Sequence, residues 1–201
     1  MTVIFGIKED DKIIIAGDKR GSDDNGGFIS DDLQKVIPIN NHLCIAFAGN
    51  AAIKSAIMKN VEEVEQKNKL FVEDLLEIID SFYKKVRENG CDVIYSYSFY
   101  GLIAGKGTDG KAHLYNVGKF KNGFAYKEVP MALYPPLDTN QDECNNIFVK
   151  NYKLHRRDFV ERTIKEISQM SNTVSSTGNS WTYGFTTHTG EMNEINGDKH
   201  Y

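Results

Sequence analysis

The hydrophobic pattern of the first fifty residues predicts two β-hairpins. Apolar runs at 2–8 and 12–17 flank a short acidic turn, and the second run holds four consecutive apolar residues, which indicates a strand buried on both faces. Runs at 34–39 and 42–48 flank Asn40-Asn41, a pair that tolerates the left-handed backbone of a tight turn. A loop rich in Gly, Ser and Asp separates the two hairpins.

Helical periodicity follows the second hairpin. Asn50 is a preferred N-cap residue, and apolar residues then recur every three or four positions to about residue 67 and again over 71–88. The same spacing returns over 138–153 and 156–170, so the pattern predicts two pairs of helices. Further strands are predicted at residues 93–104, 111–117, 123–128, 130–133, 181–187 and 191–195, with a polar loop at 171–180.

The order of these elements is strands, two helices, strands, two helices, strands. Strands segregated from helix pairs favour antiparallel sheets covered by helices over a doubly wound parallel sheet. We therefore predict an α+β fold, a four-layer αββα sandwich with two antiparallel sheets between two helix pairs. The 201 residues suffice for a sizeable core and fit one domain, so residues 1–201 are predicted to form a single domain.

Composition and charge argue against several classes of function. Hydrophobic residues make up 40% and charged residues 26% of the chain, as in ordinary soluble proteins. The net charge is −4 without a Lys/Arg cluster, which argues against a nucleic-acid partner. No apolar run reaches the ~20 residues that span a bilayer, and the Met-Thr-Val start lacks the basic region of a signal peptide, so no membrane partner is expected.

Cysteine usage favours a reducing compartment. The three cysteines are odd in number and widely spaced, which indicates reduced thiols and a cytoplasmic location. None has metal-ligand spacing with another Cys or a His, and no metal or organic cofactor is implied. Cys44 lies in an apolar run and is predicted to be a core residue.

The ends of the predicted hairpins carry the residues with the clearest chemical potential. If Met1 is removed, Thr2 becomes the N-terminus and bears both a hydroxyl nucleophile and a free α-amine that can act as its base. An α-amine has an ordinary pKa of about 7.7–8.0, so it can accept a proton near neutral pH. The ammonium group of Lys35, if close, would lower that pKa by like-charge repulsion and favour negative charge on the Thr2 oxygen.

Three more residues have roles in the same chemistry. Asp18 would orient and neutralise Lys35 so that the lysine can lie in a partly dry cleft, and Arg20 would help to brace Asp18. The backbone N–H of Gly49 would donate to the oxyanion of a tetrahedral intermediate. Singly, each residue has a commoner structural explanation, such as a turn aspartate, a solvated strand lysine or the glycine before a capped helix. Their combination in this order and spacing favours the catalytic interpretation.

The stretches around these residues resemble the proteasome β-type subunits and the peptidase subunit of the related bacterial two-component ring protease. The separations from Thr2 to Asp18 and from Lys35 to Gly49 match those of the family, and the loop between Asp18 and Lys35 is one residue longer. The resemblance is strong over about 2–60 and topological beyond. It implies an N-terminal nucleophile hydrolase fold and peptide-bond cleavage through an acyl-enzyme on Thr2. The matching stretches are Thr2-Val3-Ile4-Phe5-Gly6-Ile7, Ile14-Ile15-Ala16-Gly17-Asp18-Lys19-Arg20, Gln34-Lys35-Val36 and Ala46-Phe47-Ala48-Gly49.

The later part of the chain departs from the family pattern. Where the family has a Gly-Ser-Gly turn ahead of the third helix, this chain has Ala-Leu-Tyr-Pro-Pro at 132–136. The Asp and the Ser three residues later that complete the family's site correspond to Asn172 and Ser175. Asn172 can form hydrogen bonds but carries no charge. The resemblance therefore implies a hydrogen-bond network around Thr2 that differs from that of the family.

The resemblance also implies which residues line the substrate pocket. They are uncharged, so an apolar side chain is expected at the P1 position of the substrate. They are Gly21, Leu33, Phe47, Ala51 and Ser55.

These inferences predict a threonine-type endopeptidase whose activity depends on the removal of Met1. The resemblance implies a polypeptide substrate and a homo-oligomeric ring or related assembly, and leaves room for an ATP-dependent unfoldase or cap as a partner. Two alternatives stay open. One is a non-catalytic proteasome-like subunit that builds or gates an assembly, and the other is an N-terminal nucleophile amidase that acts on a small molecule.

Overall fold

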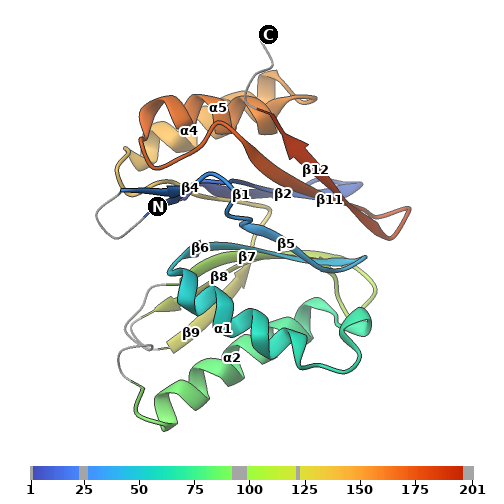
Figure 1. Cartoon of the computed structure of the whole chain (residues 1–201). Helices are drawn as coiled ribbons and strands as arrows, with labels where there is room; N and C mark the ends of the chain where they lie inside the picture. The colour runs from blue at the N-terminus through green and yellow to red at the C-terminus, as the bar shows by residue number, and fades with distance from the viewer. Residues whose placement is uncertain (1, 23–26, 92–98, 121–122, 197–201) are drawn as a thin grey trace.

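Two antiparallel sheets form the centre of the structure (Figure 1). The computed structural model describes residues 2–22, 27–91, 99–120 and 123–196. The first sheet has the strand order β10 (Met131–Tyr134), β1 (Ile4–Lys8), β2 (Lys12–Asp18), β11 (Gly178–Gly184), β12 (Thr189–Ile195). The second has the order β5 (Val36–Asn40), β6 (Leu43–Gly49), β7 (Phe99–Lys106), β8 (Ala112–Phe120), β9 (Gly123–Glu128). A small ribbon of β3 (Gly21–Ser22) and β4 (Phe28–Ser30) follows β2.

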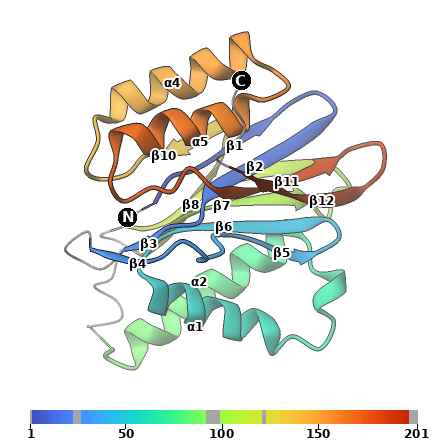
Figure 2. The same cartoon turned by 45° about the horizontal axis from the view of Figure 1, so that its top comes forward.

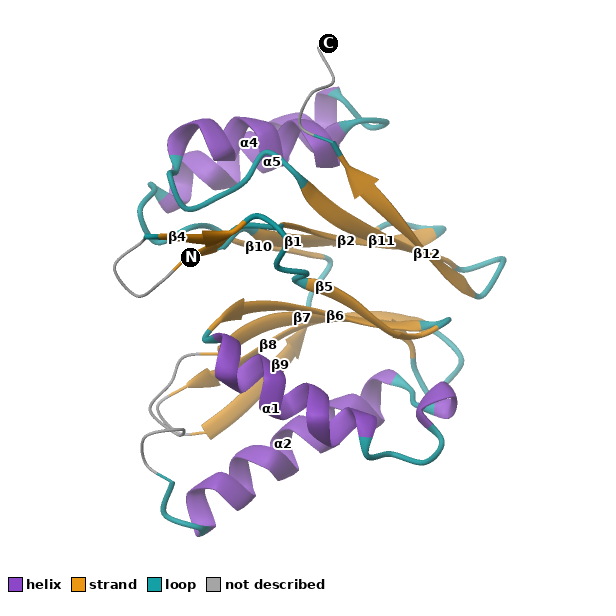
Figure 3. Cartoon of the chain, viewed as in Figure 1, coloured by secondary structure: helices purple, strands orange, loops and turns teal. Residues whose placement is uncertain are grey.

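Helices cover the outer faces of both sheets (Figure 3). The first sheet is covered by α4 (Gln141–Leu154) and α5 (Phe159–Met170), which lie side by side (Figure 2). The second sheet is covered by α1 (Ala51–Glu62) and α2 (Val72–Glu88). The predicted α+β sandwich is confirmed, with the strands inside and the helices outside.

The alternation of side chains along the strands divides the core. On β6, Leu43, Ile45 and Phe47 pack toward α1 and α2, whereas Cys44 and Ala46 pack between the two sheets. This is the period-two pattern of a strand buried on both faces. Each large apolar side chain buried in this way stabilises the fold by roughly 1.5–3 kcal/mol. The prediction that Cys44 belongs to the core is confirmed, since its side chain is fully buried.

Strand pairing brings several chain segments to one end of the first sheet. Because β1 runs antiparallel to β2, Ile4 at the start of β1 lies opposite Gly17 near the end of β2. Because β11 runs antiparallel to β2, Gly178 at the start of β11 lies opposite Asp18. Thr2 lies two residues before β1, so the residues before β1, after β2 and before β11 converge at this end of the sheet.

Two predicted boundaries were wrong. The first helix ends at Glu62 rather than near residue 67, and Lys67–Lys69 form a separate 3-10 turn. The helix closes at its C-cap Glu63, whose backbone N–H donates to the Lys59 carbonyl at 3.1 Å. Strand β11 begins inside the predicted polar loop 171–180, because Asn179 and Ser180 are buried while their backbones pair with β2. The second half of the strand predicted at 93–104 is seen as part of β7, and its first half, 93–98, lies outside the described part of the chain.

Candidate active site

A buried ion pair lies where the segments converge. The Nζ atom of Lys35 is 2.6 Å from Oδ1 of Asp18, and the two side chains are 3% and 0% exposed. Asp18 is the last residue of β2, and Lys35 immediately precedes β5. The backbone carbonyl of Lys35 accepts a hydrogen bond from Phe47 N–H at 3.0 Å, so the lysine is already fixed to the second sheet. The pair therefore joins the two sheets.

The Asp18 carboxylate is held by four donors from different parts of the chain. Oδ1 accepts from Lys35 Nζ and, at 3.0 Å, from the backbone N–H of Val3. Oδ2 accepts from the backbone N–H groups of Arg20 at 2.9 Å and Ser175 at 3.3 Å. A carboxylate held by four donors in this way keeps its orientation. Val3 is bonded to Thr2, so Asp18 fixes the backbone one peptide bond from the predicted nucleophile.

The surroundings of Lys35 tune its proton affinity. Burial lowers the pKa of Lys35, the charge and hydrogen bond of Asp18 oppose that effect, and the charge of Lys54 adds to the lowering. Lys54 lies on the first turn of α1, where its Nζ atom donates to the Gln34 carbonyl. Burial lowers the pKa of Lys54 as well. Sequence reasoning missed Lys54, although its position four residues after the helix cap at Asn50 would have placed it at this end of the helix.

Arg20 contacts Asp18 through its backbone. Its backbone N–H, not its guanidinium, donates to Asp18. The guanidinium forms a bidentate pair with Asp31, with 2.8 Å from Nε to Oδ1 and 3.1 Å from Nη2 to Oδ2, and donates to the Asn172 carbonyl at 3.0 Å. The hydrogen bond with Asp31 raises the pKa of Arg20, and the same bond lowers the pKa of Asp31. Sequence reasoning missed Asp31 as the partner of this arginine.

The two predicted residues of the late segment contribute through their backbones. Ser175 is buried and donates its N–H to Asp18, while its hydroxyl lies 2.7 Å from Oγ1 of Thr177. Asn172 is exposed, and its carbonyl accepts from Arg20. The structure thus brings both positions to the Asp18 cluster, with the backbone of Asn172 as the group that takes part in it.

Gly49 lies at the junction of β6 and α1. Its φ is 112°, in a region that side-chain-bearing residues rarely adopt, so this junction requires glycine. The next residue, Asn50, caps α1 by accepting the N–H of Ala52 at 2.8 Å. Gly49 is exposed, which leaves its surroundings accessible to a ligand.

The comparison with known families agrees with this arrangement. A family model described as "Proteasome subunit" matches residues 2–128, more than half of the chain. The chain belongs to the proteasome subunit family. No curated protein matched the sequence. The match runs from Thr2, two residues before β1, to the end of β9, so it includes Asp18, Lys35 and Gly49 but not the segment that carries Ser175.

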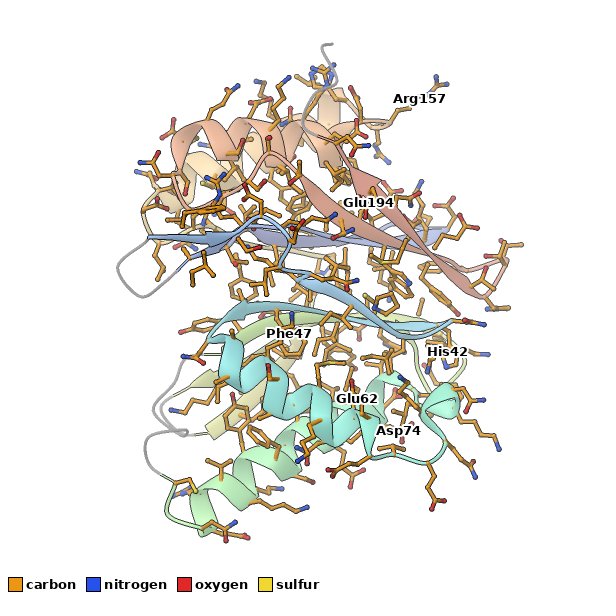
Figure 4. All side chains as sticks on the ribbon, viewed as in Figure 1. His42, Phe47, Glu62, Asp74, Arg157 and Glu194 are labelled. Atoms are coloured by element: carbon orange, nitrogen blue, oxygen red, sulfur yellow. The ribbon has the colours of Figure 1, made fainter. Side chains whose placement is uncertain are left out.

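The predicted pocket residues of this proteasome-family chain divide into three groups. Gly21 and Leu33 lie together, since a Cβ built on Gly21 would be 3.4 Å from Leu33 Cδ2. Ala51 and Ser55 are exposed on the first turns of α1. Phe47 is only 5% exposed and its ring packs 5.5 Å from that of Phe99, on the α1 side of β6 (Figure 4). Phe47 thus belongs mainly to the core between the second sheet and its two helices, α1 and α2.

The remaining candidate groups of this family member are a buried cysteine and possible metal ligands. Burial raises the pKa of Cys44 well above its ordinary value, which keeps this thiol protonated and unreactive. Among the described residues, no group of three or more His, Cys, Asp or Glu side chains is arranged to hold a metal ion. Over the same residues, no helix has both the length and the apolar character needed to cross a membrane.

Proposed function

We propose that this chain is a threonine-type endopeptidase that uses Thr2 as an N-terminal nucleophile after removal of Met1. The observation that carries the proposal is the buried Lys35–Asp18 pair, whose carboxylate also holds the Val3 amide beside Thr2. A buried charge pair is expensive to desolvate, and its net stabilisation is small or absent. The pair holds the backbone one peptide bond from the Thr2 hydroxyl, so a role in activating that hydroxyl would account for its presence.

The proposed reaction proceeds through an ester on Thr2. The α-amine accepts the proton of the Thr2 hydroxyl while Oγ attacks the scissile carbonyl carbon. The oxyanion of the tetrahedral intermediate accepts a hydrogen bond from the N–H of Gly49. Collapse of the intermediate breaks the C–N bond, and the α-ammonium gives its proton to the leaving amine. Water, deprotonated by the same amine, then hydrolyses the ester and restores Thr2.

Lys35 and Asp18 prepare the nucleophile in this proposal. The Lys35 ammonium lowers the pKa of the α-amine by repulsion, so that more of the amine is neutral at physiological pH. It also stabilises negative charge that develops on the Thr2 oxygen. Asp18 keeps the lysine charged and in place through the 2.6 Å contact. Arg20, Asn172 and Ser175 hold Asp18 and its surroundings.

The substrate is proposed to be a polypeptide with an apolar P1 side chain. Gly21, Leu33, Ala51 and Ser55 supply uncharged surface, and Phe47 would form an apolar floor. Hydrolysis of a fluorogenic series with apolar, basic and acidic P1 residues tests this preference. Faster cleavage after basic or acidic residues contradicts it.

The proposal includes the architecture and assembly typical of the family. Residues 1–201 form one domain with the four-layer αββα arrangement of N-terminal nucleophile hydrolases, and copies assemble into a homo-oligomeric ring. Such an assembly would confine proteolysis to an inner chamber in the cytoplasm, fed by an ATP-dependent unfoldase or cap. Native mass spectrometry and electron microscopy of the purified protein test the assembly.

The decisive experiment combines intact mass with an activity assay. Mass spectrometry first establishes whether Met1 has been removed. The Met-free protein is then assayed with Thr2→Ala as the inactive control and Thr2→Ser as the conservative variant. Turnover that depends on Thr2 supports the proposal. A Met-free protein without such turnover rejects it and favours a non-catalytic subunit, while Thr2-dependent turnover of small amides only, in a free monomer, favours an amidase.

A further inference from the structure

The segment 171–177 reaches the Asp18 cluster without any ionisable side chain of its own. Its seven residues are Ser, Asn, Thr, Val, Ser, Ser and Thr. Its backbone nevertheless makes two contacts with the cluster. Ser175 N–H donates to Asp18, and the Asn172 carbonyl accepts from Arg20. Polar loop residues have many alternative hydrogen-bonding arrangements. Something must therefore select the one that is observed.

A carboxylate from a different loop anchors this segment. Asp138 lies between β10 and α4, and both of its oxygens accept from the Ser171 hydroxyl, at 2.8 and 2.9 Å. Its Oδ1 atom also accepts from the Thr173 hydroxyl at 3.1 Å. The two hydroxyls lie 2.8 Å apart, and both residues are buried, at 4% and 3% exposure. Asp138 thus holds the residues on either side of Asn172.

Helix stability does not explain the position of this carboxylate. Ser171 is the C-cap of α5, and negative charge near a helix C-terminus is unfavourable. The N-terminus of α4 is already capped by Asn140, whose Oδ1 accepts from the N–H groups of Asp142 and Glu143. The hydrogen bonds of Asp138 are instead directed at the segment that reaches Asp18.

We propose that Asp138 is a positioning residue of the active site, which fixes the 171–177 segment so that Ser175 and Asn172 can hold Asp18 and Arg20. This inference rests on the proposed peptidase function for its catalytic consequence. Asp138 acts through Ser171 and Thr173 and has no direct contact with Asp18. The connection runs from its carboxylate through two hydroxyls and four residues of backbone to the Ser175 N–H, and from there to the carboxylate that orients Lys35.

The test compares Asp138→Ala and Asp138→Asn with Asp142→Ala in the Met-free full-length protein. Asp142 is a matched exposed carboxylate four residues away, on the first turn of α4. Two readouts are measured: hydrogen exchange of the peptide that contains 171–177, by mass spectrometry, and kcat and KM on a fluorogenic peptide with an apolar P1 residue. We expect Asp138→Ala to speed exchange of this peptide about tenfold and to lower kcat about tenfold at nearly constant KM.

The isosteric variant and the control separate positioning from a general loss of stability. Asp138→Asn keeps one acceptor oxygen, so its hydrogen exchange and its kcat should lie between those of Asp138→Ala and the wild type. Asp142→Ala should match the wild type in both measurements. The proposal is overturned if Asp138→Ala behaves like Asp142→Ala, or if exchange accelerates uniformly over the chain. Exchange does not require turnover. If the wild-type protein is inactive, local acceleration at 171–177 still supports the anchoring role, and its absence rejects that role independently of the peptidase proposal.

Discussion

Two charged clusters of this molecule use the same kinds of groups and differ in burial. In the first, Lys35 and Asp18 are almost inaccessible to solvent, and backbone N–H groups complete the carboxylate's hydrogen bonds. In the second, His113 on β8 lies 3.0 Å from Asp109 and 3.0 Å from Glu128, which also pairs with Lys8 at 3.1 Å. The carboxylates of this second cluster are 45% and 42% exposed.

Both clusters connect the two sheets, but they differ in how far solvent screens their charges. Lys8 ends β1 in the first sheet and Glu128 ends β9 in the second, so the exposed cluster joins the sheets as the Lys35–Asp18 pair does. Water screens the exposed groups, and such pairs contribute at most about 1 kcal/mol each. The buried pair has no water to replace a missing partner. The exposed cluster is therefore suited to adjustment by pH and salt, whereas the buried one is suited to holding its groups in a fixed arrangement.

The largest effect is expected from Asp18→Ala. The substitution leaves a buried lysine and three backbone N–H groups without their acceptor, which should lower the free energy of unfolding by about 3–5 kcal/mol. Urea denaturation at pH 7 measures the loss, with Asp109→Ala in the exposed cluster as the matched control. We expect the control to lose much less, because solvent screens the exposed cluster. Equal losses for the two variants would remove the distinction between the clusters.

Lys35→Met should separate activity from stability. The methionine keeps most of the apolar stem, and Asp18 keeps its three backbone donors, so the free energy of unfolding should fall by only about 1–3 kcal/mol. If the proposed function holds, Thr2-dependent turnover should fall by at least about 10²–10³, because the charge proposed to activate Thr2 is lost. Lys84→Met, in an exposed pair with Asp80, is the control. Turnover within a factor of two of the wild type would exclude Lys35 from the reaction.

His113→Gln should give a smaller effect that depends on pH. Burial lowers the pKa of His113, but hydrogen bonds and charges from Asp109 and Glu128 outweigh it, so its pKa lies above the ordinary value. The protonated histidine therefore stabilises the folded state below the unfolded-state pKa of about 6.5, and this contribution is lost as pH rises through the higher folded-state pKa. The variant should melt lower than the wild type at pH 5.5, by an amount equivalent to up to about 1 kcal/mol, and nearly match it at pH 8.5. A melting-temperature difference between the variant and the wild type that grows as pH rises would contradict the prediction.

The smallest effect is expected from Lys8→Met. The Lys8–Glu128 pair is 32% and 42% exposed, so its loss should cost about 0.5 kcal/mol or less at low salt. At 1 M NaCl, where the screening length is about 3 Å, the difference from the wild type should vanish. Urea denaturation at both salt concentrations measures it. A salt-independent loss above about 1 kcal/mol would show that the exposed cluster behaves like the buried one.

The sequence predicted the parts of the site that local pattern determines. Asp18 and Gly49 end strands whose apolar periodicity is strong, and Lys35 directly precedes such a strand. Packing of the two sheets then brings Lys35 to Asp18. The sandwich itself followed from the order of helices and strands. Single-domain organisation and the catalytic roles stay predictions.

The parts that the sequence missed depend on contacts between distant loops. Asp138 and Asp31 look like ordinary turn residues, and their partners Ser171 and Arg20 become apparent only when the loops are placed in space. The early start of β11 was missed because its first residues are polar, and pairing with β2 satisfies their backbones in the core. The sequence likewise could not reveal that Arg20 contacts Asp18 through its backbone N–H while its guanidinium pairs with Asp31.

The hydrogen bond from Ser175 to Asp18 has a consequence for how the protein is made. It spans 157 residues, and β11, which follows Ser175, completes the first sheet beside β2. At 5–20 residues per second, a ribosome needs roughly 8–30 s to reach Ser175 after it has made Asp18. During that time the lysine, the aspartate and the threonine are present in the nascent chain, but the segment that fixes them is not. The hydrogen bonds around Asp18 can therefore be completed only after Ser175 has been synthesised and β11 can pair with β2.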